Sequence, residues 1–177
     1  PLLKIFVFAS PHRPRRPGKA PKDPPPLPLL PAYLDTCYLC PGNTRATGAQ
    51  NDPYTQTFVF ENDFAALKDV QVEAQDTDTH FGLFRIAPAR GKCYVVCFHP
   101  HHNLTLAQMT TAPYSAETHI IPIIHAWRDM YMRISAENPF VQYIQLFENK
   151  GSAMGCSNPH PHGQIWALDY VPTEPMK

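Results

Sequence analysis

The 177-residue chain carries 15 basic and 15 acidic side chains, so its formal net charge at pH 7 is zero. This balance argues against a nucleic-acid binder held by general electrostatic attraction, and no stretch approaches the roughly 18 apolar residues of a membrane span. The length suits one domain, and 44% of the residues are hydrophobic, which is enough for a core. Five cysteines, an odd number, favour metal binding in a reducing compartment over a disulfide framework.

Short runs rich in β-branched and aromatic residues predict strands, and polar or turn-forming residues separate them. In chain order these runs cover residues 4–9, 57–60, 93–98, 141–148 and 162–168. The proline-rich stretch 14–31 is expected to run extended over the surface. Its part from Pro24 to Pro31 is interpreted as a semi-rigid connector in preference to a peptide-docking motif.

One helix is predicted between Thr118 and Ile134, because apolar residues recur there at alternating spacings of four and three. The predicted apolar face consists of Ile120, Ile124, Trp127, Tyr131 and Ile134. Pro122 must lie in the first turns of this helix or kink it. Several strands, one main helix and long connections predict the α+β class with an antiparallel sheet.

Cys37 and Cys40 are separated by two residues, a spacing that lets both thiolates reach one tetrahedral zinc ion from a tight turn. The alternative is a pair of buried cysteines without a metal. Two further ligands could come from the histidines His99, His101, His102, His160 and His162, and spacing does not choose among the first three. Cys93 and Cys97 are expected to be small buried residues of a strand.

Residues 160, 162 and 164 alternate, so on a strand the side chains of His160, His162 and Gln164 would share one face. A neutral imidazole at such a place can attack phosphorus and form a covalent phosphoramidate. Gln164, Ser157 and backbone N–H groups could stabilise the charge on the phosphoryl oxygens. Gly163 is interpreted as a point where a phosphate approaches the backbone. The alternative is that both histidines bind metal and no chemistry occurs.

The segment FENKGSAMGCSNPHPHGQIWA resembles the active-site signature of the galactose-1-phosphate uridylyltransferase family, which belongs to the histidine-triad superfamily. The segments SPHRPRRP, CYLCPGNTRATG, FVFENDFAAL and ARGKCYVVCFHPHHNLTL also resemble this family, in the family's order. The resemblance implies a histidine-triad-like antiparallel sheet with a flanking helix and long loops. It also implies that residues 1–177 form a single nucleotidyltransferase domain, the N-terminal half of the family's chain without the C-terminal half.

The resemblance assigns the role of nucleophile to His162, which would attack UDP-glucose, release glucose 1-phosphate and pass UMP to galactose 1-phosphate. It places the ligands of one Zn²⁺ ion at Cys37, Cys40, His102 and His160. It places sugar-nucleotide contacts at Arg13, Arg16, Ala46, Asn62, Asp63, Asn149, Gly155, Cys156, Ser157 and Gln164. Gln164 stands where related hydrolases carry a third histidine, and the resemblance links this glutamine to transfer.

The resemblance further implies a homodimer and a second metal site in the C-terminal half. A cytoplasmic location without nucleic-acid or membrane partners is expected, in line with the charge balance and the lack of a long apolar stretch. Gly18 stands where the family tends to carry tryptophan, and the segment PFVQYIQLFENKG is longer than the family's compact form. Two other functions remain under consideration. One is a different histidine-triad enzyme, such as a nucleotide hydrolase or a dinucleotide phosphorylase, and the other is an inactive zinc-stabilised domain that binds nucleotide without turnover.

Overall fold

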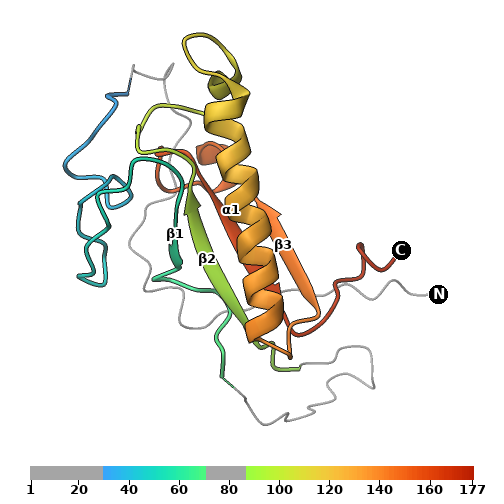
Figure 1. The fold of residues 1–177 in the computed structure, drawn as a ribbon. Coiled ribbons are helices and arrows are strands. Elements are labelled where there is room, and N and C mark those ends of the chain that lie inside the picture. Colours follow the sequence, from blue (N-terminus) through green and yellow to red (C-terminus); the bar gives the residue numbers. More distant parts are fainter. Residues whose placement is uncertain (1–29, 71–86) are drawn as a thin grey trace.

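The computed structural model describes residues 30–70 and 87–177, and Figure 1 shows how their elements are arranged. The strands and helices are β1 (Phe58–Glu61), β2 (Gly91–Cys97), η2 (Gln108–Thr110), α1 (Ala116–Glu137), β3 (Tyr143–Phe147), η3 (Ser152–Met154) and β4 (His162–Leu168). The strands form a four-stranded sheet in the order β1-β2-β4-β3, and every neighbouring pair is antiparallel. The predicted α+β class with an antiparallel sheet is therefore confirmed.

The strand predictions can be compared with the structure wherever it describes the chain. Four of them are confirmed to within two residues at each end: 57–60 (β1), 93–98 (β2), 141–148 (β3) and 162–168 (β4). Residues 4–9 and most of the proline-rich stretch 14–31 lie outside the described residues. Cys93 and Cys97 are both fully buried in β2, as expected for small strand residues.

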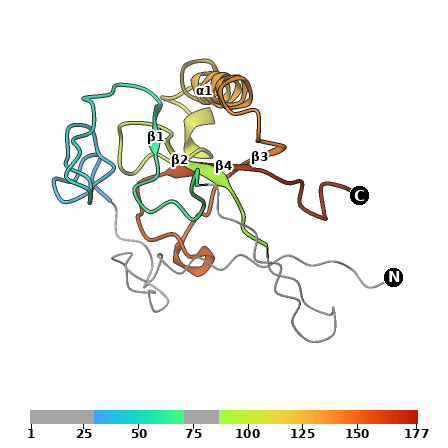
Figure 2. The same cartoon turned by 90° about the horizontal axis from the view of Figure 1, so that it is seen from below.

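The main core lies between α1 and one face of the sheet. Figure 2 shows α1 on one side of the sheet and η3 on the other. Buried side chains of the helix and of the two central strands form this core: Val96, Ile123, Met130, Ile134, Ile165 and Ala167. Trp127 of α1 meets the ring of Phe98 edge-on, with 6.0 Å between ring centroids. Among the described residues, no helix combines the length and apolar composition needed to cross a bilayer.

The apolar face of α1 differs from the predicted one. Ile124 and Tyr131 are 49% and 46% exposed, whereas their neighbours Ile123 and Met130 are buried in the core. Residues 120, 123, 127, 130 and 134 also repeat at spacings of three and four, so periodicity fits both stripes. Packing against the sheet selects one of them. The helix also extends past the predicted range at both ends, and Pro122 lies inside it, in the second turn.

The sheet face opposite α1 carries the side chains that matter for chemistry. Along β4, His162 and Gln164 are half-buried, while the alternating residues Gly163 and Ile165 are buried on the side of α1. The prediction that residues 160, 162 and 164 share a strand face needs a correction, because β4 begins at His162. His160 belongs to the preceding loop, since Pro161 cannot donate a ladder hydrogen bond and marks the start of the strand.

Gly163 is required by the core. A Cβ at this position would lie 2.9 Å from the carbonyl oxygen of Phe147 and 2.9 Å from the ring of Phe98. The close approach that this glycine permits is therefore made by a neighbouring strand and a core ring. The interpretation of Gly163 as a contact point for phosphate is replaced by this packing role.

Gly163→Ala is expected to lower the free energy of unfolding by roughly 1–3 kcal/mol, because the added methyl overpacks the core. The Phe98 ring can shift, but the carbonyl of Phe147 is held in the ladder between β3 and β4. Urea denaturation at equilibrium measures the change. In a Phe98→Leu background, where one obstacle is smaller, the same substitution should cost less. Equal costs in both backgrounds would contradict the proposed overlap.

Candidate metal centre and active site

Cys37 and Cys40 lie on a tight turn that precedes β1. The N–H of Cys40 donates to the carbonyl of Cys37 at 3.1 Å, and the N–H of Leu39 points at Cys37 Sγ at 3.4 Å. The side-chain amides of Asn43 and Asn51 each donate to two carbonyl oxygens of this turn. These contacts hold the backbone so that both sulfurs can face one point, as a metal-binding turn requires.

Two histidines from distant segments face these sulfurs. Cys40 Sγ lies 3.6 Å from Nδ1 of His102 and 3.5 Å from Nδ1 of His160, and Cys37 Sγ lies 3.9 Å from the latter. The four ligand atoms all lie within 4.8 Å of one another, and all four residues are buried. A tetrahedral zinc site with ordinary bond lengths needs sulfur–nitrogen separations of about 3.5 Å. The donor set and its spacing therefore fit one metal ion.

The protonation of His160 suits a metal ligand. Its Nε2 lies 2.9 Å from the carbonyl oxygen of His99, and because a carbonyl only accepts, Nε2–H is the donor and Nδ1 presents its lone pair to the sulfurs. The hydroxyl of Tyr54, which donates to the carbonyl of Leu39 at 2.6 Å, lies 3.4 Å from the same Nε2. Burial lowers the pKa of His160 to about 4 and also lowers the pKa of His102. Both rings are therefore neutral at pH 7.

The structure distinguishes the three histidines that spacing left open. His102 is 1% exposed and turns its Nδ1 toward Cys40. His99 contributes its backbone carbonyl, and its ring packs against those of His101 and His119, with centroids 4.6 and 5.2 Å away. The residues brought together are thus the same four that the resemblance indicated as zinc ligands.

Metal uptake is expected to release at least one proton per ion at pH 7 and to tighten as the pH rises. Burial raises the pKa of Cys40 to about 11, so this thiol is protonated at pH 7 and must lose its proton to become a ligand. The neutral ring of His160 contributes none. The apparent association constant should rise by up to about tenfold per pH unit for each thiol that ionises. Zn²⁺ titrations between pH 6 and 9 with a pH indicator measure both effects, and a pH-independent affinity would contradict them.

His162 is the first residue of β4 and lies next to the metal cluster. Its Nδ1 is 2.7 Å from the carbonyl oxygen of His160, so Nδ1–H is the donor and the lone pair lies on Nε2. His160 therefore contacts both the metal cluster and His162, through different groups. Its side chain faces the cysteines, and its carbonyl oxygen sets the tautomer of His162.

Gln164 lies two residues after His162, on the same face of β4. The indole N–H of Trp166 can only donate, and it lies 3.3 Å from Gln164 Oε1, which assigns the orientation of the amide. Trp166 is itself held by an edge-on contact with Phe147, with centroids 5.6 Å apart. This orientation leaves the NH₂ group of Gln164 as a donor suited to a phosphoryl oxygen.

The loop that contains Gly155, Cys156 and Ser157 lies on the side of the sheet opposite α1, where η3 is seen in Figure 2. Gly151 and Gly155 adopt φ values of 83° and 77°, which favour glycine. The N–H of Gly155 donates to the carbonyl of Ser152 at 2.9 Å, and that of Cys156 donates to Gly151 at 3.2 Å. Two of the backbone donors considered for an anion are thus used inside the loop in this structure.

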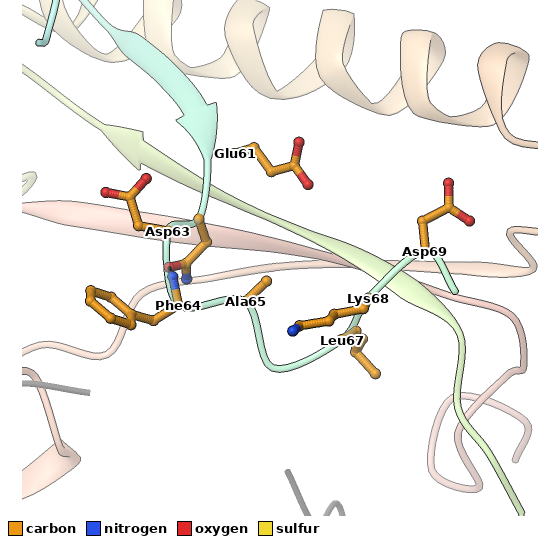
Figure 3. Close-up of a pocket in the computed structure, with 8 residues that line it drawn as sticks. Glu61, Asp63, Phe64, Ala65, Leu67, Lys68 and Asp69 are labelled. Atoms are coloured by element: carbon orange, nitrogen blue, oxygen red, sulfur yellow. Dashed lines mark hydrogen bonds between the residues drawn. The ribbon is translucent and has the colours of Figure 1, made fainter. Parts of the chain in front are cut away.

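A cavity of about 400 Å³ adjoins the segment after β1 and is lined by residues 61–65 and 67–69 (Figure 3). It includes two predicted contact residues. Asn62 Oδ1 accepts the N–H of Phe64 at 3.0 Å, which stabilises a turn. Asp63 lies 3.6 Å from Nε of Arg45, and the guanidinium of Arg45 covers the ring of Phe60 at 4.2 Å. Sequence reasoning did not single out Arg45, although it stands next to the predicted contact residue Ala46.

The remaining predicted contact residues are scattered. Ala46 is exposed in a small hairpin closed by a bridge between Thr44 and Gln50. Asn149 is half-buried just after β3. Arg13 and Arg16 lie outside the described residues. The structure therefore brings the metal cluster, His162 and Gln164 together, and it places Asn62 and Asp63 at a separate cavity near the end of β1.

An antiparallel sheet with one covering helix, and a Cys₂His₂ cluster beside the first residue of a central strand, define a histidine-triad-like α+β domain. A sequence model described as galactose-1-phosphate uridyl transferase, N-terminal domain, matches residues 1–172. The chain belongs to this family. The resemblance drawn from the motifs is thereby confirmed.

Curated relatives align with nearly the whole of this chain. It is 41% identical to galactose-1-phosphate uridylyltransferase of Kluyveromyces lactis, covering 100% of this chain and 49% of the relative. It is 43% identical to the protein of the same name from Schizosaccharomyces pombe, covering 98% of this chain and 48% of that one. The protein of that name from Saccharomyces cerevisiae is 41% identical, with 98% and 48% covered. The chain spans about half the length of the curated relatives it matches.

Solved structures share the fold. A uridylyltransferase structure superposes with a TM-score of 0.66 at 23% identity, covering 98% of this chain and 46% of that one. An ADP-glucose phosphorylase from Arabidopsis thaliana, solved with bound ADP-glucose, superposes with a TM-score of 0.53 at 28% identity. That match covers 92% of this chain and 45% of the phosphorylase.

Proposed function

We propose that this chain carries the nucleotidyl-transfer site of a uridylyltransferase that exchanges UMP between UDP-glucose and galactose 1-phosphate. The intermediate would be a covalent uridylyl group on His162. Identities of 41% and 43% to proteins named galactose-1-phosphate uridylyltransferase support the reaction. The observation that carries the mechanism is the 2.7 Å contact between His162 Nδ1 and the carbonyl oxygen of His160, because it leaves the lone pair on Nε2.

The proposed reaction has two displacements at one phosphorus. First, His162 Nε2 attacks the α-phosphorus of UDP-glucose, and a P–N bond forms as the P–O bond to the β-phosphate breaks. Glucose 1-phosphate leaves with the electron pair. Next, a phosphate oxygen of galactose 1-phosphate attacks the same phosphorus, the P–N bond breaks and UDP-galactose leaves. The ring becomes positive in the intermediate, and the carbonyl of His160 stabilises that charge through Nδ1–H.

Gln164 is proposed to donate its NH₂ group to a non-bridging phosphoryl oxygen, in the orientation that Trp166 imposes. This role accounts for a glutamine where related hydrolases carry a third histidine. Further contacts with the sugar nucleotide are proposed at Arg13, Arg16, Ala46, Asn62, Asp63, Asn149, Gly155, Cys156 and Ser157. Arginine guanidinium groups suit phosphate because they donate in a planar pair.

Zn²⁺ is the proposed metal, held by Cys37, Cys40, His102 and His160. When bound, it would supply structure by fixing the three chain segments that carry its ligands. The consequence for the reaction comes through His160, because fixing its side chain also fixes the carbonyl that orients His162. A second metal site would belong to the C-terminal half of the relatives.

Residues 1–177 are proposed to form one histidine-triad-like nucleotidyltransferase domain, corresponding to the N-terminal half of the relatives. The five cysteines are all free thiols, which suits a reducing compartment, and we propose a cytoplasmic location. A homodimer is proposed on the family resemblance alone.

UDP-glucose labelled in the α-phosphate tests the proposed reaction. The expected result is an acid-labile, base-stable adduct that maps to His162, with release of an equal amount of glucose 1-phosphate. Added galactose 1-phosphate should then remove the label as UDP-galactose. Label that appears only as free UMP would favour a nucleotide hydrolase instead. Label removed by inorganic phosphate as UDP would favour a phosphorylase, which the fold shared with the ADP-glucose phosphorylase makes a relevant comparison. UDP-glucose that binds without an adduct would indicate an inactive domain.

A further inference from the structure

We propose that Asn158 is a positioning residue that couples the Cys37 thiolate to the backbone of His160. This inference rests on the metal centre proposed above and extends it to a residue outside the ligand set. Asn158 is 5% exposed and lies two residues before His160. Its side chain reaches Cys37, which is 121 positions away in the sequence.

The orientation of the Asn158 amide follows from its two neighbours. The backbone N–H of His160 lies 2.9 Å from Asn158 Oδ1, and because an N–H only donates, this atom must be the oxygen. The other end of the amide, Nδ2, then lies 3.5 Å from Cys37 Sγ. The sulfur is also 3.7 Å from Oδ1, but a metal-bound thiolate has no proton to give to that oxygen. The N–H···S contact is therefore the one compatible with a bound metal.

The surroundings of the sulfur make this donor important. Cys37 is 4% exposed, so water gives its negative charge little support. Two donors point at the sulfur in the described residues: the N–H of Leu39 at 3.4 Å and Nδ2 of Asn158 at 3.5 Å. Hydrogen bonds to metal ligands from outside the coordination shell orient them and tune metal affinity. Asn158 supplies one of these two donors from its side chain, so a substitution can remove it.

Asn158 also connects the metal centre to the loop before it. The backbone carbonyl oxygen of Asn158 accepts the Sγ–H of Cys156 at 3.0 Å. A short path of contacts therefore runs from the Cys37 sulfur through the Asn158 amide to the N–H of His160, whose carbonyl oxygen holds His162. Within residues 30–70 and 87–177, the contacts of Asn158 are with Cys37, Cys156 and His160, so it reaches the chemistry through this path.

Asn158→Asp tests the donor with little change of shape. The carboxylate keeps an oxygen for the N–H of His160 but replaces the N–H···S donor with a negative charge facing the thiolate. We expect the dissociation constants for Zn²⁺ and Co²⁺ to rise by roughly 10–100-fold, as is typical when such outer contacts are removed. The thiolate-to-cobalt absorption band of the Co²⁺ form should shift. Chelator competition and visible absorption measure the two effects without reference to enzymatic activity.

Asn138→Asp is the matched control. Asn138 is also 5% exposed, and its Nδ2 donates to the carbonyl of Ile134 at the end of α1, away from the metal cluster. This variant should be less stable but should keep the metal affinity and the cobalt spectrum of the unchanged protein. Asn158→Ala, which removes the donor without adding a charge, should weaken metal binding in the same direction and serves if the aspartate variant does not fold.

Two outcomes would overturn the inference in different ways. Unchanged metal affinity and an unchanged cobalt spectrum in both Asn158 variants would show that the amide does not support the thiolate, while leaving the metal centre in place. Failure of the unchanged protein to bind Zn²⁺ or Co²⁺ would overturn the proposed metal centre and the role of Asn158 with it.

Discussion

His162→Asn is expected to abolish the labelled adduct and to slow UMP transfer by at least roughly 10³-fold. Asparagine keeps an N–H near the place of Nδ1, so the contact with the carbonyl of His160 can persist. What it lacks is a nitrogen lone pair at the place of Nε2, and an amide nitrogen does not attack phosphorus. Adduct counting and transfer rates give the two measurements. Metal content and thermal midpoint should stay near those of the unchanged protein, because His162 is outside the metal cluster.

His125→Asn provides the comparison for this experiment, because the same change is made at an exposed position of α1. It should leave both the adduct and the transfer rate unchanged. An adduct that survives in His162→Asn, or that maps to His160 or Cys156, would show that the nucleophile has been assigned to the wrong residue.

Cys40→Ser is expected to remove the metal and to lower the free energy of unfolding by about 3 kcal/mol or more. Cys40 is fully buried, and its sulfur faces both imidazoles at 3.6 and 3.5 Å. A serine hydroxyl stays protonated at pH 7 and does not replace a thiolate as a zinc ligand. For a chain of this size the loss corresponds to a thermal midpoint lower by roughly 6–12 °C. Metal analysis and thermal unfolding measure the two effects.

Cys93→Ser separates loss of the metal from loss of packing. Cys93 is also fully buried, but it packs with Leu67 and Leu168 in a different cluster. Its serine variant should be less stable yet keep one metal ion per chain. A strong chelator should then lower the thermal midpoint of the unchanged protein and of Cys93→Ser, with no further effect on Cys40→Ser. Full metal content in Cys40→Ser would contradict the proposed ligand set.

The strands could be predicted because the pattern of residue types along each one matches its burial in the fold. Residues 162–167 alternate between half-buried and buried positions and follow a proline, and the predicted range 162–168 has the same ends as β4. The helix was predicted as an element, but its buried face was not, because two stripes one residue apart both satisfy the helical period. Only contact with the sheet places Ile123 and Met130 inside and leaves Ile124 and Tyr131 exposed.

The sequence predicted which kinds of residue form the site better than it predicted how they are arranged in space. Spacing pointed to a metal at Cys37 and Cys40 but could not choose His102, because the path of the loop after β2 depends on packing with distant segments. The place of His160 in the loop was missed although the signal is local, because Pro161 cannot donate a ladder hydrogen bond and marks the start of β4. Asn158 gave no motif signal, and its place two residues before a histidine ligand was the one clue available. Its importance comes from a contact across 121 positions.

The position of β4 has a consequence for how the chain assembles. Among the strands that the structure describes, β4 comes last in sequence, yet it lies between β2 and β3 and pairs with both. The metal ligand His160 lies two residues before the start of β4 and 120 positions after Cys40. During synthesis, neither the middle of the sheet nor the full set of ligands exists until His160 and the residues of β4 have left the ribosome. Until then β2 and β3 lack the strand that pairs with both of them. Folding therefore depends on contacts between residues far apart in the sequence and should be slow.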